Sequence, residues 1–89
     1  MKIPVYSTRF RKEYKLSQKR GPDIARLDKI LADLVNEVPL LPHNRDHDLR
    51  GDYAGCRECH VQGDWLLIYQ YRGGNEIVFL RTGTHSDLF

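Results

Sequence analysis

Residues 65–82 read WLLIYQYRGGNEIVFLRT and carry the strongest structural signal in the chain. Trp65–Tyr71 and Glu76–Thr82 are rich in β-branched and aromatic residues, which is typical of β-strands. The unbroken apolar start of the first run favours a central strand that is buried on both faces. Between the two runs, Arg72–Asn75 supplies the glycines of a tight turn. The segment therefore predicts a β-hairpin at the centre of a sheet.

The segments at the N-terminus predict one edge strand and a first helix. Lys2–Ser7 contains a proline, which lacks a backbone N–H and favours a position at the edge of a sheet. Ser7 or Thr8 can cap a helix that runs to about Arg20. The dipeptide Gly21-Pro22 is expected to end this helix, because glycine suits the position just past a helix end.

A second helix is predicted by apolar residues that recur every three or four positions. These residues are Ile24, Leu27, Leu31, Leu34 and Val38. Their spacing matches the 3.6-residue period of a half-buried helix. The helix is expected to begin at Pro22 or Asp23. Pro39 and Pro42 are expected to end it.

A polar loop and another strand separate this helix from the hairpin. His43–Asp48 is expected to form the loop, and Cys56–Val61 is expected to form the strand. The predicted order is β-α-α-β-β-β, an α+β fold with two N-terminal helices packed on a small, mostly antiparallel sheet. With 89 residues, the chain is expected to form a single domain over residues 1–89.

Charge is distributed unevenly along the chain. Residues 1–36 carry nine Lys or Arg against four acids, whereas residues 37–89 carry five Arg, eight acids and all four His. A basic front half indicates a polyanionic partner. No apolar run approaches the roughly 20 residues of a membrane-spanning helix, and the N-terminus lacks the features of a signal peptide. We therefore expect a cytoplasmic protein with no membrane partner.

Cys56–His60 matches the C-x-x-C-H motif of covalent haem attachment and also suggests a zinc site. If the stretch is a strand, alternate side chains point to opposite faces of the sheet. Cys56, Glu58 and His60 then share one face, and Cys59 lies on the other. Two thiols on opposite faces cannot hold one metal ion or haem together. A zinc site of His43, His47 and His60 is stereochemically possible, but loop spacing alone is a weak signal for it, so neither a metal nor a cofactor is expected. The pattern favours Cys59 as a small buried residue and Cys56 as a partly exposed free thiol.

The same alternation gathers groups that can carry protons. Glu58 and His60 share a strand face, and Asp64 lies in the turn that follows. His47 lies on the preceding loop and His85 follows the last strand, so both can reach that face. Cleavage of RNA without a metal needs one group to take the proton of the ribose 2′-OH and another to protonate the departing 5′-oxygen. Imidazole suits both tasks, because its ordinary pKa lies near neutrality.

Two further residues fit the same chemistry. Arg81 can supply a cation that steadies the phosphoryl oxygens, and Phe89 can stack on a base. The same residues also fit a simpler interpretation, in which the histidines lie on the surface and the arginine pairs with an acid. Residue spacing alone leaves both interpretations open.

Three motifs lie at informative separations: DHDLRG at 46–51, HVQGDWLLIY at 60–69 and RTGTHSDLF at 81–89. Together they resemble the YafQ branch of the RelE-type bacterial toxins, and the resemblance covers nearly the whole chain. It implies a RelE-like fold and a ribosome-dependent mRNA endonuclease of a type II toxin–antitoxin pair, which inhibits translation by cutting mRNA in the ribosomal A site. The implied partners are the 70S ribosome with its mRNA and a small, dimeric, DNA-binding antitoxin.

The resemblance also implies roles for individual residues. The catalytic residues of the family match His47, His60, Asp64 and His85. His85 is expected to be the general acid and His47 the general base. His60 and Asp64 are expected to orient the base or to share its role. Glu58 stands where relatives carry the shorter Asp, which leaves its role open.

The resemblance also implies which residues contact RNA and the ribosome. Arg81 matches a phosphate-contacting arginine, and Phe89 matches a terminal aromatic residue near the active site. Ribosome-binding residues are expected on the basic first helix: Arg9, Arg11, Lys12, Lys15, Lys19 and Arg20. The alternative is a non-catalytic RNA- or ribosome-binding module, whose activity would not depend on His85.

Overall fold

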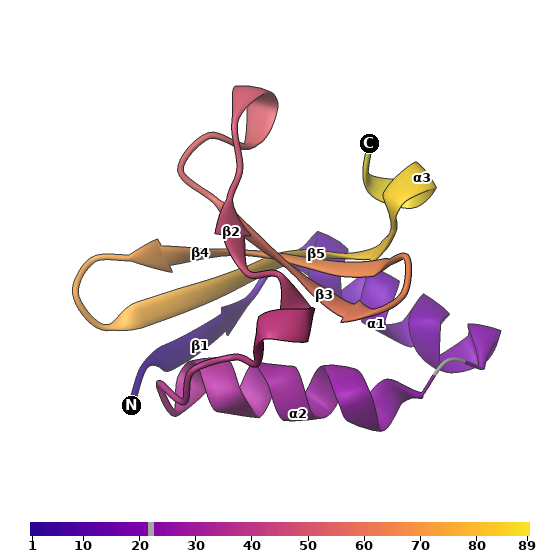
Figure 1. Ribbon diagram of the computed structural model, residues 1–89, viewed down its shortest axis with the longest axis horizontal. Coiled ribbons are helices and arrows are strands. Elements are labelled where there is room, and N and C mark those ends of the chain that lie inside the picture. The colour runs from indigo at the N-terminus through magenta and orange to yellow at the C-terminus, as the bar shows by residue number, and fades with distance from the viewer. Residues whose placement is uncertain (22) are drawn as a thin grey trace.

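The computed structural model describes residues 1–21 and 23–89 (Figure 1). The strands are β1 (Ile3–Tyr6), β2 (His47–Asp48), β3 (Arg57–Gln62), β4 (Trp65–Arg72) and β5 (Glu76–Thr84). The helices are α1 (Thr8–Arg20), α2 (Ile24–Val35) and α3 (His85–Leu88), with two short 3₁₀ turns, η1 (Pro42–Asn44) and η2 (Gly51–Tyr53). Pro22, where we expected one helix to end or the next to begin, lies outside the described residues. No helix within residues 1–21 and 23–89 is long and apolar enough to cross a membrane.

The strands form one sheet in the order β1-β5-β4-β3-β2. β1 pairs with β5 in parallel, and the other neighbouring pairs are antiparallel. The hairpin of residues 65–82 lies in β4 and β5, and β4 is the central strand, as its unbroken apolar start predicted. The predicted α+β fold with a mostly antiparallel sheet is confirmed.

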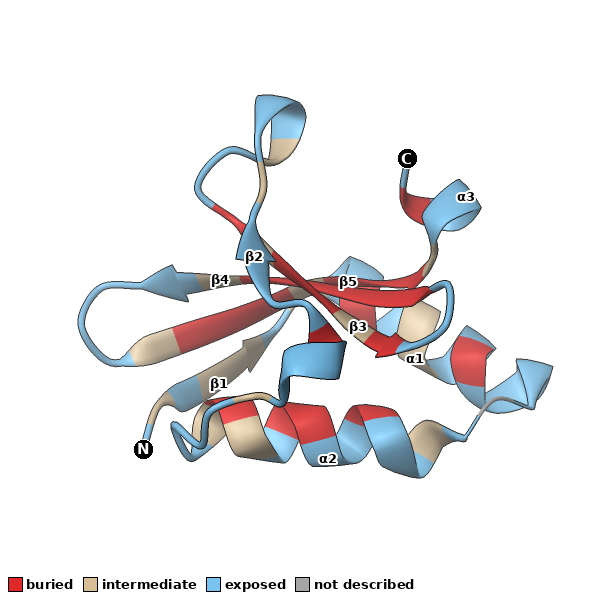
Figure 2. Cartoon of the chain, viewed as in Figure 1, coloured by how far each residue is buried: buried red, intermediate tan, exposed pale blue. Residues whose placement is uncertain are grey.

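Helices α1 and α2 lie on one face of the sheet and enclose the main core (Figure 1). Phe10 of α1 and Leu27 and Leu31 of α2 belong to the same buried cluster as Tyr69 and Phe79 of the sheet. Figure 2 shows the buried residues of α2 on the side that faces the sheet. Burial of each such side chain contributes about 2 kcal/mol. The core thereby holds the sheet in place, so that the residues on the other face of the sheet have fixed positions.

That other face, called here the open face, carries a smaller buried cluster. Cys56, Leu66, Ile68 and Leu88 form it, beneath the short helix α3. The register of β4 and β5 shifts after Ile68 and leaves Leu80 as an extra residue on β5. Such a bulge changes which residues of the strand face each side of the sheet. Leu80 packs against the open-face cluster as a result.

Side chains form hydrogen bonds with the backbone of β5 and of β3 at both edges of the sheet, beyond the ends of the short outer strands. On one edge, Ser7 Oγ donates to a β5 carbonyl at 2.8 Å, and Glu13 accepts from the Thr82 N–H at 3.3 Å. On the other edge, Asn44 Nδ2 donates to the His60 carbonyl at 2.8 Å. Unpaired strand edges invite pairing with other chains, and these contacts satisfy part of each edge.

The second helix ends three residues earlier than its apolar period predicted. Its last residue is Val35, and the N–H groups of Glu37 and Val38 donate to carbonyls of the last turn at 3.3 and 2.8 Å. Glu37 has φ 60°, so this is the Schellman arrangement, which ends a helix without a proline. The prediction that Val38 lies on the helix and that Pro39 and Pro42 end it is therefore wrong.

Two short elements lie where no regular structure was predicted. His47 and Asp48, expected in a loop, form β2 by pairing with β3. β5 continues through Gly83 to Thr84, and α3 follows directly. A strand of two residues is too short to show an alternating pattern, so only the pairing with β3 identifies it.

Candidate active site

A row of paired residues crosses the open face from β2 to β5. His47 of β2 stands opposite Glu58 of β3. Glu58 stands opposite Ile68 of β4, which in turn stands opposite Arg81 of β5. Residues that stand opposite each other on neighbouring strands point to the same face. The row therefore brings His47 and Arg81 to one face. Glu58 and Ile68 lie between them.

A second row, closer to the β3–β4 turn, carries His60. His60 stands opposite Leu66 of β4, which stands opposite Gly83 of β5. Since neighbouring strands lie about 4.8 Å apart, His60 and Gly83 are separated by about 10 Å. The chain then enters α3, whose first residue is His85. The open face thus holds His47 and His60 toward β2, and His85 toward β5.

One buried carboxylate joins the two histidines on the β2 side. Glu58 is 5% exposed, and its Oε1 lies 3.6 Å from His47 Nε2 and 3.9 Å from His60 Nε2. The Nδ1 of His47 lies 2.6 Å from the carbonyl of Arg45, which favours a proton on Nδ1. Nε2 is then the basic nitrogen of the neutral ring. A proton taken there is stabilised by the charge of Glu58.

A reciprocal cap holds α3. The Thr84 N–H donates to Asp87 Oδ2 at 3.0 Å, and the Asp87 N–H donates to Thr84 Oγ1 at 3.3 Å. Arg20 Nη1 lies 2.9 Å from the same carboxylate. The bond from the Thr84 N–H, and then Arg20, lower the pKa of Asp87 from its ordinary 3.8. Because folding depresses this pKa, the contribution of the cap is complete above the ordinary value and is lost as the pH falls through the lowered one.

His85 and Phe89 lie exposed around α3. The His85 N–H donates to Asp64 Oδ1 at 3.3 Å, so Asp64 holds the first residue of α3 by its backbone. The His85 ring lies 4.9 Å from the Phe89 ring, centroid to centroid, and Tyr53 meets Phe89 edge-on at 5.6 Å. This arrangement leaves the imidazole and the Phe89 ring open to solvent on the side where a ligand can approach.

Arg81 is buried in an ion pair. Its Nη2 lies 2.6 Å from Glu13 Oε2, and its Nε donates to the other oxygen at 3.3 Å. Its Nη1 donates to Tyr53 Oη at 3.2 Å, and Nη2 also reaches the Asp87 carbonyl at 3.4 Å. Hydrogen bonding to Glu13 raises the pKa of Arg81 above its usual range. Arg81 thus ties α1, η2 and α3 to β5.

Glu13→Gln is expected to destabilise the fold, because the Arg81 guanidinium loses its anionic partner. The two side chains are 16% and 11% exposed, and a loss of about 2 kcal/mol is expected for a pair buried to this degree. Urea unfolding measures the loss. The matched control is Glu76→Gln, which breaks the more exposed pair with Arg72 and should cost below about 0.5 kcal/mol. Equal losses in the two variants would contradict the role given to Glu13.

Gly83→Ala is expected to displace α3. A Cβ at this position would lie 3.1 Å from Asp87 Cβ and 3.5 Å from Leu88 Cδ2, so the helix must shift. We expect a loss of about 1 kcal/mol in stability and changed NMR signals for His85 and Phe89. At Gly74 a Cβ would meet no atom within 4 Å, so Gly74→Ala is the control. Unchanged His85 signals in Gly83→Ala would show that α3 does not rest on this glycine.

The basic residues predicted to bind the ribosome lie on the surface of α1. All six are exposed: Arg9, Arg11, Lys12, Lys15, Lys19 and Arg20. Arg20 also pairs with Asp87, so this helix reaches the cap of α3. The open face and the basic helix are therefore joined at α3.

Cys56 and Cys59 lie in different clusters on opposite faces of the sheet, as the alternation predicted. The expectation that Cys56 is partly exposed is wrong: it is 8% exposed, and burial raises the pKa of its thiol. Within residues 1–21 and 23–89, no three His, Cys, Asp or Glu side chains are grouped as a metal site would require. The two thiols of the C-x-x-C-H motif thus point to opposite sides of the sheet.

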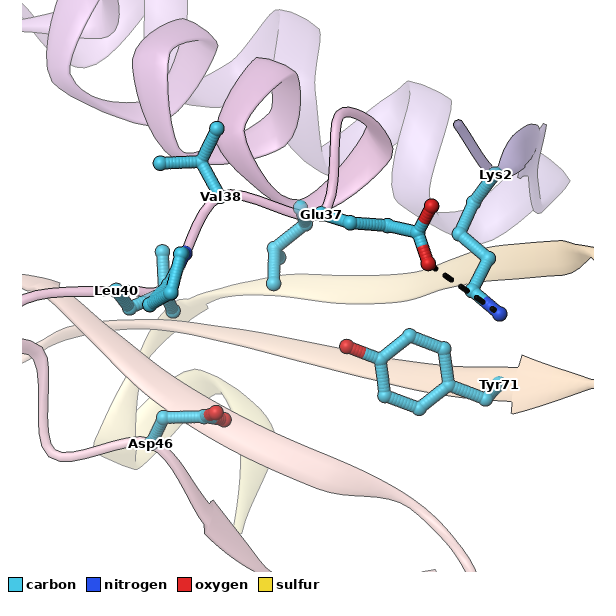
Figure 3. A pocket seen from close by; sticks show the side chains of 8 residues that line it. Lys2, Glu37, Val38, Leu40, Asp46 and Tyr71 are labelled. Atoms are coloured by element: carbon cyan, nitrogen blue, oxygen red, sulfur yellow. Dashed lines mark ion pairs between the residues drawn. The ribbon is translucent and has the colours of Figure 1, made fainter.

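A hollow of about 300 Å³ lies away from these residues, near the hairpin end of the sheet (Figure 3). Lys2 Nζ lies there 3.9 Å from Glu37 Oε1 and 5.5 Å from the centre of the Tyr71 ring. Asp46, on the other wall, is already paired with Arg57 at 3.2 Å. The charged groups of this hollow are thus satisfied by their neighbours, and the hollow contains none of the predicted site residues.

For three residues that contact the site, the sequence did not predict the role that the structure shows. Glu58 was placed on the correct strand face, but its length left its role open. Glu13 is the only acid in residues 8–20, and this isolation in a basic helix was a usable signal for a pairing partner. Nothing in the sequence pointed to Tyr53, which reaches Arg81 and Phe89 from a 3₁₀ turn.

Comparisons with known proteins agree over the whole chain. Residues 2–89 match the family model described as bacterial toxin of type II toxin-antitoxin system, YafQ. The chain is 41% identical over 85 residues to the mRNA interferase toxin YafQ of Escherichia coli, covering 94% of this chain and 91% of that protein. Its fold is similar to the crystal structure of YafQ from E. coli, with TM-score 0.93, 38% identity and coverage of 100% and 99%. It is also similar to a chain in the crystal structure of the E. coli DinJ-YafQ complex, with TM-score 0.91, 39% identity and the same coverage.

Proposed function

The chain belongs to the YafQ family of bacterial type II toxins, and from this premise we propose that it cleaves mRNA on the ribosome by general acid–base chemistry. It is an endoribonuclease of the kind to which its relatives, named mRNA interferases, belong. The chemical part of the proposal rests on one observation. Two imidazoles share the Glu58 carboxylate, and a third lies across the open face at the start of α3.

In the proposed reaction, His47 Nε2 takes the proton of the ribose 2′-OH as that oxygen attacks the adjacent phosphorus. His85 gives a proton to the 5′-oxygen as the bond from phosphorus to that oxygen breaks. The products are a 2′,3′-cyclic phosphate and a free 5′-OH, and no water is consumed in this step. Glu58 stabilises the imidazolium formed at His47. His60, at the same carboxylate, orients the base or shares its role.

The two proton carriers are proposed to act from opposite sides of the phosphorus. In-line displacement places the attacking and leaving oxygens on opposite sides of that atom. His47 and His60 lie on β2 and β3, whereas His85 lies beyond β5. Leu66 of the open-face cluster separates them and would form an apolar floor beneath the scissile phosphate.

Arg81 and Phe89 are proposed to hold the substrate between these groups. Glu13 occupies Nε and Nη2 of Arg81, so Nη1, which contacts Tyr53 Oη, is the part of the guanidinium that can reach a phosphate oxygen. Arg81 would then act as an already oriented cation. Phe89 is 56% exposed and can stack on a base beside His85.

Ribosome dependence is supported by the basic surface of α1. Six exposed cations on α1 suit the phosphates of ribosomal RNA, since such contacts dominate affinity for nucleic acids. Fixing the mRNA strand in the A site would lower the activation barrier by several kcal/mol, up to about 11 kcal/mol.

The partner that silences the toxin is proposed to be a small dimeric antitoxin with a DNA-binding part. An acidic, partly disordered segment of this antitoxin would cover the basic surface of α1. The proposal is supported by the family and by the fold shared with a chain of the E. coli DinJ-YafQ complex. A cytoplasmic location belongs to the same proposal, because the substrate is mRNA on ribosomes.

End-group analysis of the cleaved mRNA tests the proposed chemistry. Fragments should carry a 2′,3′-cyclic phosphate at the upstream end of the cut and a 5′-OH on the downstream piece. Downstream fragments with a 5′-phosphate would contradict attack by the 2′-oxygen. Arrest of translation with intact mRNA would instead identify a non-catalytic ribosome-binding module.

A further inference from the structure

A hollow lined by arginine and histidine side chains, called here the basic groove, lies beside His60 at the outer edge of β3. Its volume is about 440 Å³, and its walls include Arg26, His43, Arg45, His60 and Gln62. η1, which carries His43, lies against β3 near α2 at this edge (Figure 1). None of the described residues that line the groove is acidic. The groove therefore concentrates positive charge beside one end of the candidate active site.

The walls of the basic groove are held in place by the fold. Asn44 of η1 is 6% exposed, and its Nδ2 donates to the His60 carbonyl at 2.8 Å, which fixes η1 to β3. Arg45 follows η1 with φ 48°, and its carbonyl lies 2.6 Å from His47 Nδ1. The residue that orients His47 thus also presents a guanidinium to the groove. The groove and the proposed base are parts of one rigid unit.

The cations of the groove have little compensating charge. The Arg45 guanidinium has no ion-pair partner within residues 1–21 and 23–89, and Arg26 has only the exposed Asp23 at 3.6 Å. Arg81 and Arg57, by contrast, are held by carboxylates at 2.6 Å. An arginine that has no carboxylate partner and lies beside a hollow has its whole guanidinium available for an anion.

We propose that the basic groove binds the RNA phosphate that lies on the 5′ side of the nucleotide whose 2′-OH attacks. This inference rests on the proposed function. The base at His47 and His60 must face the 2′-OH, which belongs to the nucleotide upstream of the cut, while His85 faces the downstream 5′-oxygen. The upstream strand therefore leaves the site on the His60 side. The basic groove is the cationic hollow next to His60 on that side.

The lining favours RNA over an antitoxin segment. Val61 is the apolar side chain among its walls, and it is 4% exposed. A helix or strand of a protein partner typically places apolar side chains at the centre of its interface, and among the described lining residues Val61 alone offers such contact. A phosphodiester and ribose need cations and hydrogen-bond donors, which Arg26, Arg45 and Gln62 supply.

Two RNAs and two variants test the basic groove. The first RNA contains a 2′-deoxynucleotide at the cut position, so that it cannot react, and extends on both sides. The second begins at that nucleotide and lacks the phosphate on its 5′ side. Binding of each labelled RNA to the free protein is measured by fluorescence anisotropy at several salt concentrations. Arg26→Gln/Arg45→Gln is compared with Arg72→Gln, which removes one charge at the hairpin end of β4.

The double variant should bind the longer RNA about tenfold more weakly than wild type at low salt. The slope of log affinity against log salt should fall by about 0.7 for each lost phosphate contact. Arg72→Gln should keep wild-type affinity, and wild type and double variant should bind the shorter RNA equally. On ribosomes, the double variant should show a raised KM for mRNA with kcat within about twofold of wild type.

Three results would overturn the proposal. One is a double variant that binds the longer RNA as Arg72→Gln does. Another is a double variant that loses affinity equally for both RNAs, because the groove would then not bind the upstream phosphate. The third is weakened antitoxin binding with unchanged RNA binding. Absence of cleavage by wild type on ribosomes is a separate result, which would contradict the proposed function. The RNA-binding comparison would still show whether the basic groove binds the upstream phosphate.

Discussion

His85→Ala is expected to lower the rate of mRNA cleavage at least about 100-fold, because the departing 5′-oxygen loses its proton donor. The structure predicts little effect on folding. His85 is exposed, its ring contacts Phe89, and its bond to Asp64 is made by the backbone N–H, which alanine retains. A change in unfolding free energy within about 0.5 kcal/mol is therefore expected. Binding of the antitoxin should be unchanged.

The activity of His85→Ala is measured by cleavage of mRNA on ribosomes and by growth after expression of the toxin alone. Ser86→Ala is the matched control, because Ser86 is the next exposed residue on α3. This control should cleave mRNA and arrest growth as wild type does. Full growth arrest by His85→Ala would remove His85 from the role of general acid.

Glu58→Gln is expected to reduce kcat about 10- to 100-fold with little change in KM. The substitution keeps the size of the side chain but removes the charge that stabilises a proton on His47 or His60. A role for Glu58 in folding alone would lower the free energy of unfolding and the amount of active protein, and it would leave the kcat of the folded protein unchanged.

Two comparisons make the Glu58 result specific. Glu58→Asp retains the charge and should keep more activity than Glu58→Gln. Glu76→Gln removes a carboxylate at the far end of β5, where it pairs with Arg72, and should leave kcat unchanged. A Glu58→Gln variant with wild-type kcat would show that the two histidines do not depend on their shared carboxylate.

Much of the fold was predictable because strong local patterns decided it. The apolar run in β4, the glycine turn and the helical period of α2 each act within one segment. The alternation in β3 also separated Cys56 from Cys59 and placed Glu58 beside His60. These inferences needed only the periods of strand and helix.

The remainder depended on contacts between distant segments. β2 exists because His47 and Asp48 meet the edge of β3, and two residues carry no periodic signal of their own. The ion pair of Arg81 joins residues 68 positions apart, so sequence spacing did not indicate its partner Glu13. The early end of α2 arises from Glu37 in a left-handed conformation, which the sequence more often signals with glycine.

Primer extension on a defined mRNA, with and without 70S ribosomes, tests the central claim most directly. Purified wild-type protein should produce cuts within in-frame codons when ribosomes are translating the message. The same protein should leave the mRNA essentially intact when ribosomes are omitted. Equal cleavage without ribosomes would contradict ribosome dependence. No cleavage in either condition, by folded protein, would contradict the proposal that the histidines of the open face form an RNA-cleaving site.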